Sequence, residues 1–486
     1  MKKTNFKDYK LSSDLLTAIE LLGFISPTEV QAQVIPLVLA KRDVLVQAQT
    51  GSGKTAAFAI PLCELVDWEE NKPQVLILTP TRELALQVKE DVFNIGRFKR
   101  IKVPVLYGKS PITRQIKELK QKTHIVVGTP GRVLDHLKRE TLITDGIKYL
   151  VIDEADEMLN MGFRDEVEKI IKNLPQKPVT MLFSATLPEW VASLAAKYMQ
   201  EPIQVEIAAE NLVKDNIVQE FYFVEEKEKL ALLRSVTVLE NPDSCLIFCS
   251  TQRVVDLVNR ELQKLHYGCE KIHGGMLQEA RTSVMTNFKK GKFRYLVATD
   301  VAARGIDVDD ISLVLNFDVP RGEETYVHRI GRTGRIGKSG RAITFVTERE
   351  NWFPTEILEF TGVELLEKAH PTAVEVAVAQ AAFNEKIQER PIAKEEKGAK
   401  LSEDIMKIHI NAGKKTKMRA MDIVGTLCSI EGITAEDIGI ISILDISTFV
   451  EILNAKGAMV LGELQNRNIK GRPRRVSRVE EEFDRI

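Results

Sequence analysis

Residues 48–55, AQTGSGKT, are of the types that hold the phosphates of a nucleotide. Gly51 and Gly53 let the backbone turn tightly, so that its N–H groups point at phosphate oxygens. Lys54 can reach the β- and γ-phosphates, and the Thr55 hydroxyl can ligate Mg²⁺. A β-forming run precedes the segment and an apolar helical pattern follows it, which is the order of a phosphate loop; the alternative is a glycine-rich turn without a ligand. The expected nucleotide-binding residues here are Ala48, Gln49, Thr50, Gly51, Ser52, Gly53, Lys54 and Thr55.

Two carboxylates could complete a hydrolytic site. Asp153 and Glu154 come directly after the apolar run 149–152. A carboxylate at the end of a buried strand can hold Mg²⁺ largely through its water shell, and Glu154 can act as general base on the attacking water. Together with Lys54, these residues predict hydrolysis of a nucleoside triphosphate. The alternative is an acidic first turn of a helix, which the helix dipole favours without any chemistry.

A basic motif near residue 330 supplies the charge that phosphoryl transfer requires. Negative charge spreads over the γ-phosphate oxygens during transfer, and arginine side chains stabilise it. Arg332 and Arg335 lie far along the chain from Lys54. They can serve only if a second domain closes on the first, so we expect hydrolysis to depend on domain closure. The alternative is a basic turn that faces solvent.

The elements that must position these residues are strands that alternate with helices. A chain of 486 residues predicts two to four domains. Expected strands in a first domain, 1–207, are 44–47, 75–79, 103–106, 124–128, 149–152, 180–184 and 203–207. Those in a second domain, 217–368, are 217–224, 245–249, 268–272, 294–298, 313–317 and 341–346. The alternation predicts an α/β fold with two parallel sheets, helices on both faces of each, and ligands at the carboxyl ends of the strands.

Composition restricts where the protein works and what it binds. The net charge of −1 means that any nucleic-acid site must come from local basic patches. The N-terminus has no apolar run of the signal-peptide kind, and no apolar stretch is long enough to span a membrane. Five scattered cysteines fit reduced thiols rather than disulfides or a metal cluster. We therefore expect a cytoplasmic protein without a membrane span, in which Cys245 and Cys249 are core residues.

The C-terminal part of the chain predicts a small third domain. Residues 384–403 are charged and poor in apolar side chains, which is typical of a linker. Residues 404–479 then give strand 405–410, helix 418–430, strands 438–444 and 448–453, helix 458–465 and strand 474–479. This βαββαβ order is the ferredoxin-like layout of RNA-recognition-motif (RRM-type) α+β domains.

The charge of the third domain favours RNA. Residues 404–479 contain 12 Lys and Arg against 8 Asp and Glu. The strand that usually offers stacking aromatic side chains has Ser447 at the main position, and the first strand offers only His409, so stacking on the sheet is not favoured. Basic side chains gather instead in the stretch 470–475 and in the loop before the first helix. The expected RNA-binding residues of that loop are Lys414, Lys415, Lys417 and Arg419.

Over residues 6–345 the motifs resemble those of DEAD-box ATP-dependent RNA helicases. This family commonly carries Ala at the position of Ala48, and residues 153–156 read DEAD. The resemblance implies two RecA-like domains, ATP and Mg²⁺ as cofactors, and hydrolysis of ATP to ADP and phosphate. It also implies that Phe24 and Gln31, preceded by Phe6, contact adenine. Nucleotide contacts from the second domain are implied for Gly305 and Asp307.

The same resemblance implies an RNA path that reads backbone rather than sequence. Residues 184–186, SAT, are implied to couple nucleotide state to RNA binding. One departure is Tyr107-Gly108-Lys109, where the family often has two glycines. The implied RNA contacts are Pro80, Thr81, Arg82, Gly108, Thr129, Gly131, Arg132, Thr251, Gln278, Arg281 and Thr299.

The appended domain, with its basic loop and poor stacking strand, is similar to that of the DbpA-type bacterial helicases. This implies a target in 23S ribosomal RNA and a role in assembly of the large ribosomal subunit. Two alternatives stay open at this point. One is a general RNA helicase in mRNA decay or cold adaptation, and the other is a non-catalytic, ATP-gated RNA clamp.

Overall fold

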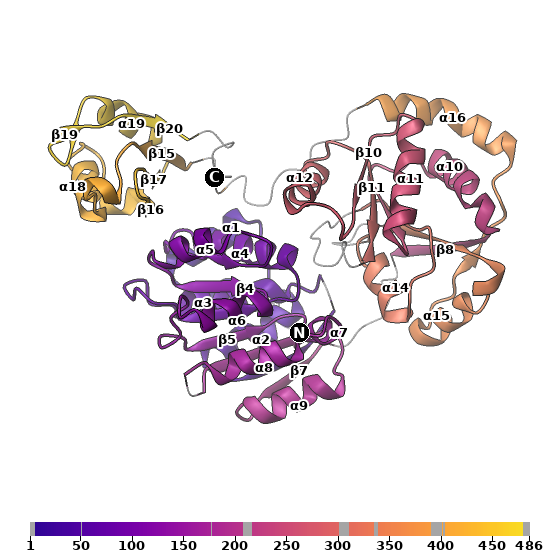
Figure 1. Ribbon diagram of the computed structural model, residues 1–486, viewed down its shortest axis with the longest axis horizontal. Helices are drawn as coiled ribbons and strands as arrows, with labels where there is room; N and C mark the ends of the chain where they lie inside the picture. Colours follow the sequence, from indigo (N-terminus) through magenta and orange to yellow (C-terminus); the bar gives the residue numbers. More distant parts are fainter. Residues whose placement is uncertain are drawn as a thin grey trace. The chain divides into compact units, whose positions relative to one another are not determined.

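The computed structural model describes residues 5–49, 51–175, 177–207, 216–300, 311–334, 339–389, 401 and 404–479. The chain divides into two compact units. One contains residues 1–48, 52–207 and 397–486, and the other contains residues 49–51 and 208–396. Because the first unit holds two separate sheets, the fold is described below as three domains (Figure 1).

The first domain is a seven-stranded parallel sheet with the order β3-β4-β2-β5-β6-β1-β7. Its strands are β1 (Val44–Gln47), β2 (Val75–Leu78), β3 (Val105–Leu106), β4 (Ile125–Gly128), β5 (Tyr149–Ile152), β6 (Val179–Ser184) and β7 (Ile203–Glu206). Its helices are α1 (Ser13–Leu21), α2 (Glu29–Leu39), α3 (Lys54–Leu65), α4 (Arg82–Ile95), α5 (Ile112–Leu119), α6 (Pro130–Lys138), α7 (Ala155–Asn160), α8 (Arg164–Lys172) and α9 (Glu189–Tyr198). The predicted parallel α/β architecture is confirmed.

Both faces of this sheet are covered, as the apolar strands require. Successive side chains of a strand point to opposite faces. Val44 and Val46 lie in one core, and Leu45 lies in the other. The strand expected at 103–106 is shorter than predicted, because Pro104 has no N–H to donate to a neighbouring strand. Only its carbonyl takes part in the hydrogen bonding of the sheet, where it accepts from the backbone N–H of Val127 at 3.2 Å.

The second domain is also a seven-stranded parallel sheet, with the order β10-β11-β9-β12-β13-β8-β14. Its strands are β8 (Ile217–Phe223), β9 (Cys245–Cys249), β10 (Cys269–Ile272), β11 (Tyr295–Thr299), β12 (Leu313–Asn316), β13 (Gly340–Val346) and β14 (Leu366–Glu367). The described helices are α10 (Lys229–Glu240), α11 (Gln252–Lys264), α12 (Gln278–Lys289), α14 (Glu323–Ile330), α15 (Phe353–Thr361) and α16 (Ala373–Gln388). Cys245 and Cys249 are fully buried free thiols in its core, as expected.

Helix α16 extends the second domain beyond residue 368 and into the stretch that the sequence predicts as linker, 384–403. The Phe383 ring is buried and lies 5.0 Å from the Tyr267 ring. The Arg294 guanidinium donates to the carbonyl of Lys386 at 3.0 Å, and Lys386 Nζ donates to the carbonyl of Asn241 at 2.6 Å. Residues 384–388 are therefore helical and packed, and most of the remaining predicted linker lies outside the described residues.

The third domain is a four-stranded antiparallel sheet with the order β16-β17-β15-β20. Its elements are β15 (Met406–Ile410), α18 (Ala420–Cys428), β16 (Ile438–Ile443), β17 (Thr448–Ile452), α19 (Gly457–Gln465) and β20 (Val476–Arg478). The predicted βαββαβ order is confirmed. A hairpin of β18 (Asn468–Ile469) and β19 (Arg472–Pro473), which the sequence analysis did not predict, precedes the last strand. Across the described part of the chain, no helix is long and apolar enough to cross a membrane.

Candidate nucleotide and RNA sites

The order of strands in the first sheet brings the candidate nucleotide residues together. Strand β6 lies between β1 and β5, with Gln47 paired to Ser184 and Ile152 paired to Leu182. The phosphate loop follows β1, residues 153–156 follow β5, and residues 184–186 lie at the end of β6. All three segments therefore meet at one carboxyl edge of the sheet, where ligands of α/β proteins bind.

The phosphate loop has the backbone that its glycines predict. Gly51 and Gly53 have φ angles of 79° and 93°, in the left-handed region that favours glycine. A Cβ at Gly53 would lie 2.5 Å from Nε2 of Gln31, so the Gln31 amide would have to move, and the positive φ would strain any other residue. Lys54 is the first residue of α3; its side chain is buried, and Nζ donates to the carbonyl of Ala48 at 2.7 Å. Thr50 lies outside the described residues.

The N-terminus of α2 is joined to the phosphate loop. The Gln31 amide donates to the carbonyl of Gly53 at 3.2 Å and accepts from the backbone N–H of Thr28 at 3.0 Å. The Thr28 hydroxyl donates to the carbonyl of Ser52 at 2.8 Å. Phe24 is 36% exposed, and its ring lies 6.3 Å from the Phe6 ring. The sequence analysis did not predict this contact of Thr28 with the phosphate loop; Thr28 also caps α2, in a capping box with Gln31.

Asp153 and Glu154 differ in their surroundings. Asp153 is 3% exposed, and this burial raises the pKa of its carboxyl to about 7, although the nearby Lys54 ammonium lowers it. Glu154 has a φ of 53°, so a non-glycine residue occupies the left-handed region directly before α7. The left-handed region costs a non-glycine residue free energy, so the strand before Glu154 and the helix after it must hold this backbone.

Asp156 connects the segment after β5 to the segment after β6. Its Oδ2 accepts from the backbone N–H of Ala185 at 3.0 Å, from the N–H of Thr186 at 2.9 Å and from the Thr186 hydroxyl at 3.1 Å. The Ser184 hydroxyl accepts from the backbone N–H of Asp156 at 3.2 Å. A displacement of either segment is therefore transmitted to the other.

The donors near Asp153 suit a magnesium ion. Asp153 is a buried carboxylate whose pKa is raised mainly by desolvation, and a bound cation would favour its charged form. Together with the Thr55 hydroxyl it offers hard oxygen ligands, and Mg²⁺ takes one or two carboxylates plus water and substrate phosphates. Among the described residues no group of three or more His, Cys, Asp or Glu could hold a metal by itself.

The candidate RNA residues of the first domain lie on the other half of the same carboxyl edge, after β2, β3 and β4. The Thr81 hydroxyl caps α4, and the Arg82 guanidinium donates to the carbonyl of Gly108 and lies 4.9 Å from the Tyr107 ring. Lys109 has a φ of 57°, the conformation for which the second glycine of the family pattern is suited.

Helix α6 begins at the same place, directly after Thr129, and its Gly131 has open space at the Cβ position. Arg132 Nη1 donates to the carbonyl of Ser110 and to Oε1 of Gln115, both at 3.0 Å. Pro80, Thr81, Arg82, Gly108, Thr129, Gly131 and Arg132 thus come from three neighbouring strand ends.

In the second domain, a buried arginine anchors the motif that carries Arg332. Arg329 is 2% exposed, and its guanidinium donates to both carboxylate oxygens of Asp300, at 2.5 and 2.7 Å. It also donates to the Asn316 side chain at 3.0 Å and to the carbonyl of Asp318 at 2.8 Å. The sequence analysis gave Arg329 no role of its own.

Replacing Arg329 with Ala is expected to lower the free energy of unfolding of the second domain by about 3–5 kcal/mol, because it leaves a largely buried carboxylate without its partner. Denaturant unfolding followed by circular dichroism measures this loss. Arg260→Ala removes an exposed arginine of α11 and serves as the matched control. Equal unfolding midpoints for the two variants would show that the network contributes little.

Other candidate residues of the second domain stand at element boundaries. Thr251 caps α11 through its hydroxyl, which accepts from Val254 N at 3.3 Å. Thr299 ends β11, Arg281 lies on α12, and Arg332 follows α14. Gly305, Asp307 and Arg335 lie outside the described residues, as does the side chain of Gln278.

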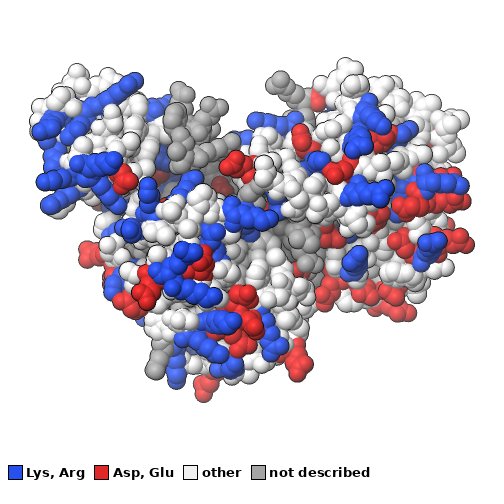
Figure 2. All heavy atoms as spheres, viewed as in Figure 1, with Lys and Arg blue, Asp and Glu red and all other residues white. Residues whose placement is uncertain are grey.

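The basic loop of the third domain is exposed, and backbone hydrogen bonds hold its first residues in place. Its expected RNA-binding side chains, on Lys414, Lys415, Lys417 and Arg419, all face solvent. The backbone N–H groups of Lys414 and Lys415 donate to the carbonyls of Leu444 and Asp445, each at 2.8 Å. Figure 2 shows Lys and Arg side chains gathered over this domain, on the face that it displays. The Ser447 hydroxyl forms a hydrogen bond of 3.0 Å with Nε2 of His409. The His409 ring packs on the Phe449 ring.

Comparison with known protein families gives three matches in chain order. Residues 28–194 match the DEAD/DEAH box helicase model, and residues 228–337 match the helicase conserved C-terminal domain. Residues 407–478 match the DbpA RNA binding domain.

Relatives of known function and solved structures agree with these matches. The chain is 55% identical to the ATP-dependent RNA helicase DbpA of Bacillus subtilis, over 98% of this chain and 99% of that protein. It is 45% identical to the DEAD-box ATP-dependent RNA helicase CshA of the same species, over 77% of this chain and 76% of that protein. The structure of S. cerevisiae Dbp5 bound to RNA and ADP BeF3 matches with a TM-score of 0.71 and 31% identity, over 79% of this chain and all of that one.

Proposed function

The chain belongs to the DEAD-box ATP-dependent RNA helicases of the DbpA type, and we propose that it remodels 23S ribosomal RNA during assembly of the large ribosomal subunit. The family activity is RNA-dependent hydrolysis of ATP. The observation that carries the proposal is the third domain, because residues 407–478 match the DbpA RNA binding domain and its basic loop is exposed. All five cysteines are free thiols, in keeping with action in the reducing cytoplasm.

We propose these roles for the residues of the nucleotide site. Phe24 and Gln31 contact adenine, and the phosphate loop with Lys54 holds the phosphates. Thr55 and Asp153 would hold Mg²⁺, which neutralises phosphate charge when bound. Glu154 takes the proton of the attacking water. Arg332 and Arg335 of the second domain place further positive charge beside the transferred phosphoryl group and stabilise its negative charge.

Coupling between hydrolysis and RNA has a physical route inside the first domain. The nucleotide residues and the candidate RNA residues lie on one carboxyl edge of a single sheet. Asp156 joins residues 153–156 to residues 184–186 by four hydrogen bonds. If a change at the γ-phosphate moves Glu154, these hydrogen bonds transmit the movement to residues 184–186.

The test of this function is the RNA preference of ATP hydrolysis. ATPase stimulation is measured with 23S ribosomal RNA, an unrelated structured RNA and DNA, for the full-length protein and for a chain ending at residue 400. The full-length protein is expected to prefer 23S ribosomal RNA. The shortened chain is expected to respond equally to both RNAs, because contacts to phosphates carry no sequence information. An unchanged preference in the shortened chain would place selectivity in the helicase core, and no preference in either form would favour a general RNA helicase.

Charge removal from the basic loop gives a second measurement. Replacing Lys414, Lys415 and Lys417 together with Ala is expected to weaken binding of 23S ribosomal RNA. The slope of log affinity against log salt should fall by about 0.7–0.9 for each phosphate that the loop no longer neutralises. The control replaces three exposed lysines of the first domain, Lys120, Lys169 and Lys172, which changes the net charge equally. Equal slopes for both triple variants would exclude phosphate binding by the loop.

A further inference from the structure

Gln115 lies in the middle of α5, a helix to which the sequence analysis assigned no function, and only 3% of this residue is exposed. A buried amide needs partners for both its oxygen and its nitrogen. Nε2 of Gln115 donates to the carbonyl of Tyr107 at 3.0 Å. Its Oε1 forms hydrogen bonds with Arg132 Nη1 and with Nε2 of His136, both at 3.0 Å. One side chain of α5 therefore joins the loop after β3 to α6.

The hydrogen-bond partners of the Gln115 amide fix its orientation. Arg132 can only donate, so the atom that it contacts must be the amide oxygen. Burial, assisted by the positive charge of Arg132, lowers the pKa of His136 to about 4, so its ring is neutral near pH 7 and carries one N–H. That proton must lie on Nε2, which donates to the same oxygen, and Nδ1 then accepts from the Thr141 hydroxyl at 2.8 Å. A reversed amide would direct its own N–H groups at two donors and its oxygen at the Tyr107 carbonyl.

Three side chains bind carbonyl groups of the loop 107–110, which contains a candidate RNA contact. The pairs of carbonyl and side chain are Tyr107 with Gln115, Gly108 with Arg82, and Ser110 with Arg132. Lys109 of this loop has a φ of 57°, a conformation that costs a non-glycine residue free energy, so the loop needs such support. A carbonyl oxygen and a phosphate oxygen are both acceptors and repel each other. The side chains therefore hold the loop with these acceptors bonded inside the protein and away from RNA phosphates.

Arg132 is fixed through one nitrogen of its guanidinium. Nη1 makes both of its hydrogen bonds inside the domain, to the Ser110 carbonyl and to Gln115, and the side chain is only 13% exposed. Among the residues that the structure describes, Nη2 has no hydrogen-bond partner. A guanidinium that is already held in this way loses little rotamer freedom when its second nitrogen binds a phosphate oxygen. Gln115 therefore prepares Arg132 for such a contact.

We propose that Gln115 is a positioning residue for RNA binding by the helicase core, and that it holds the loop 107–110 and Arg132 in one arrangement before RNA binds. Its own side chain is buried and touches no RNA. Without it, the loop and Arg132 must be ordered at the moment of binding, and this cost lowers RNA affinity. The inference rests on the proposed RNA contacts of Arg132 and Gly108. It does not depend on the 23S target, because these contacts are to the RNA backbone.

The test measures the affinity of the full-length protein for bulk ribosomal RNA, with and without a nonhydrolysable ATP analogue. The affinity without the analogue includes binding by the third domain, whereas the ratio of the two affinities reports the additional binding by the core in its nucleotide-bound state. Gln115→Met keeps the length of the side chain but removes the amide. We expect it to lower this ratio roughly tenfold. The affinity for RNA without nucleotide and the affinity for the analogue without RNA should stay unchanged, because the third domain and the phosphate loop are untouched.

Thr141→Val is the matched control for a loss of stability alone. It leaves Nδ1 of the buried His136 ring without its donor, but it keeps the hydrogen bonds of Gln115 to Arg132 and Tyr107. Both variants are expected to unfold at a lower temperature, and only Gln115→Met should lower the affinity ratio. Gln115→Glu is the second variant if Gln115→Met does not fold. Its carboxylate still accepts from Arg132 and His136 but cannot donate to the Tyr107 carbonyl, so the ratio should again fall.

A double-mutant cycle shows whether Gln115 acts through Arg132. Arg132→Ala should lower the ratio by itself, and the further loss on adding Gln115→Met should be smaller than the loss that Gln115→Met causes alone, since residues in contact are not additive. An unchanged ratio in the Gln115 variants, an equal fall in Thr141→Val, or losses that multiply fully in the double variant would overturn the inference. The 23S target is tested separately by the RNA preference of ATP hydrolysis, so it can fail while this inference stands.

Discussion

Replacing Lys54 with Ala is expected to abolish ATP hydrolysis, with a loss of at least about 10³-fold. The β- and γ-phosphates lose their main point charge. A second effect arises at Asp153, where the Lys54 ammonium opposes the rise in pKa that burial causes. Without this ammonium the pKa of the Asp153 carboxyl is raised further, which disfavours the charged form that binds a cation. Steady-state phosphate release with saturating RNA measures the loss.

Lys54→Ala also leaves the carbonyl of Ala48 without its donor, which costs about 1–3 kcal/mol for a buried group. Lys54→Gln separates the two effects, because a neutral amide can still donate to that carbonyl but carries no charge. We expect Lys54→Gln to unfold near the normal temperature and still to lack activity. Lys172→Ala, an exposed lysine at the end of α8, should retain full turnover. Restored hydrolysis in Lys54→Gln would contradict a role for the charge.

The sheets could be predicted because buried parallel strands are short apolar runs. Tyr149–Ile152 and Cys245–Cys249 contain little else, and the structure has strands with these bounds. The phosphate loop could be predicted because its glycines, lysine and threonine are adjacent in the chain. Helix α16 was missed because charge dominates its C-terminal part. Two apolar side chains, Phe383 and Ile387, decide its packing there, and only the tertiary structure reveals their partners.

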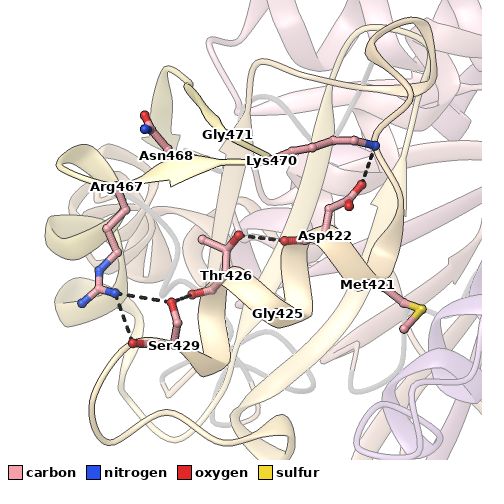
Figure 3. A pocket seen from close by; sticks show the side chains of 9 residues that line it. All are labelled: Met421, Asp422, Gly425, Thr426, Ser429, Arg467, Asn468, Lys470 and Gly471. Carbon is pink, nitrogen blue, oxygen red and sulfur yellow. Dashed lines mark hydrogen bonds and ion pairs between the residues drawn. The ribbon is translucent and has the colours of Figure 1, made fainter.

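The interactions that complete the site depend on strand order, which no local pattern contains. The hydrogen bonds from Asp156 to residues 184–186 exist because β5 and β6 are neighbours. The hydrogen bond between Gln31 and Gly53 joins segments 22 residues apart through the approach of α2 to α3. The β18–β19 hairpin was not predicted, and its turn at Lys470 and Gly471 has φ angles of 55° and 71° (Figure 3). In the sequence, Pro473 and the many basic residues of the stretch 470–475 are typical of a loop rather than of a hairpin.

Replacing Glu154 with Gln is expected to slow ATP hydrolysis by about 10²–10⁴-fold, because an amide cannot take the proton of the attacking water. The substitution changes few atoms, and the φ of 53° at this position belongs to a backbone that the flanking strand and helix hold. The side chains that hold nucleotide and RNA are untouched. Binding of ATP and of RNA should therefore stay close to normal while turnover is lost.

Single-turnover hydrolysis of prebound ATP measures the chemical step directly. Nucleotide and RNA affinities of the same variant are measured in parallel with a nonhydrolysable ATP analogue. Glu189→Gln, an exposed glutamate in the first turn of α9, removes a carboxylate elsewhere in the same domain and should hydrolyse ATP at the normal rate.

The result also separates the role of Glu154 from that of its neighbour. A base acts only in the chemical step, so its loss lowers the rate constant and leaves affinity unchanged. Loss of a group that positions the nucleotide lowers affinity as well. If Glu154→Gln hydrolyses ATP at the normal rate, another group activates the water. If it instead loses ATP binding, the Glu154 carboxylate serves to position the nucleotide rather than to supply a base.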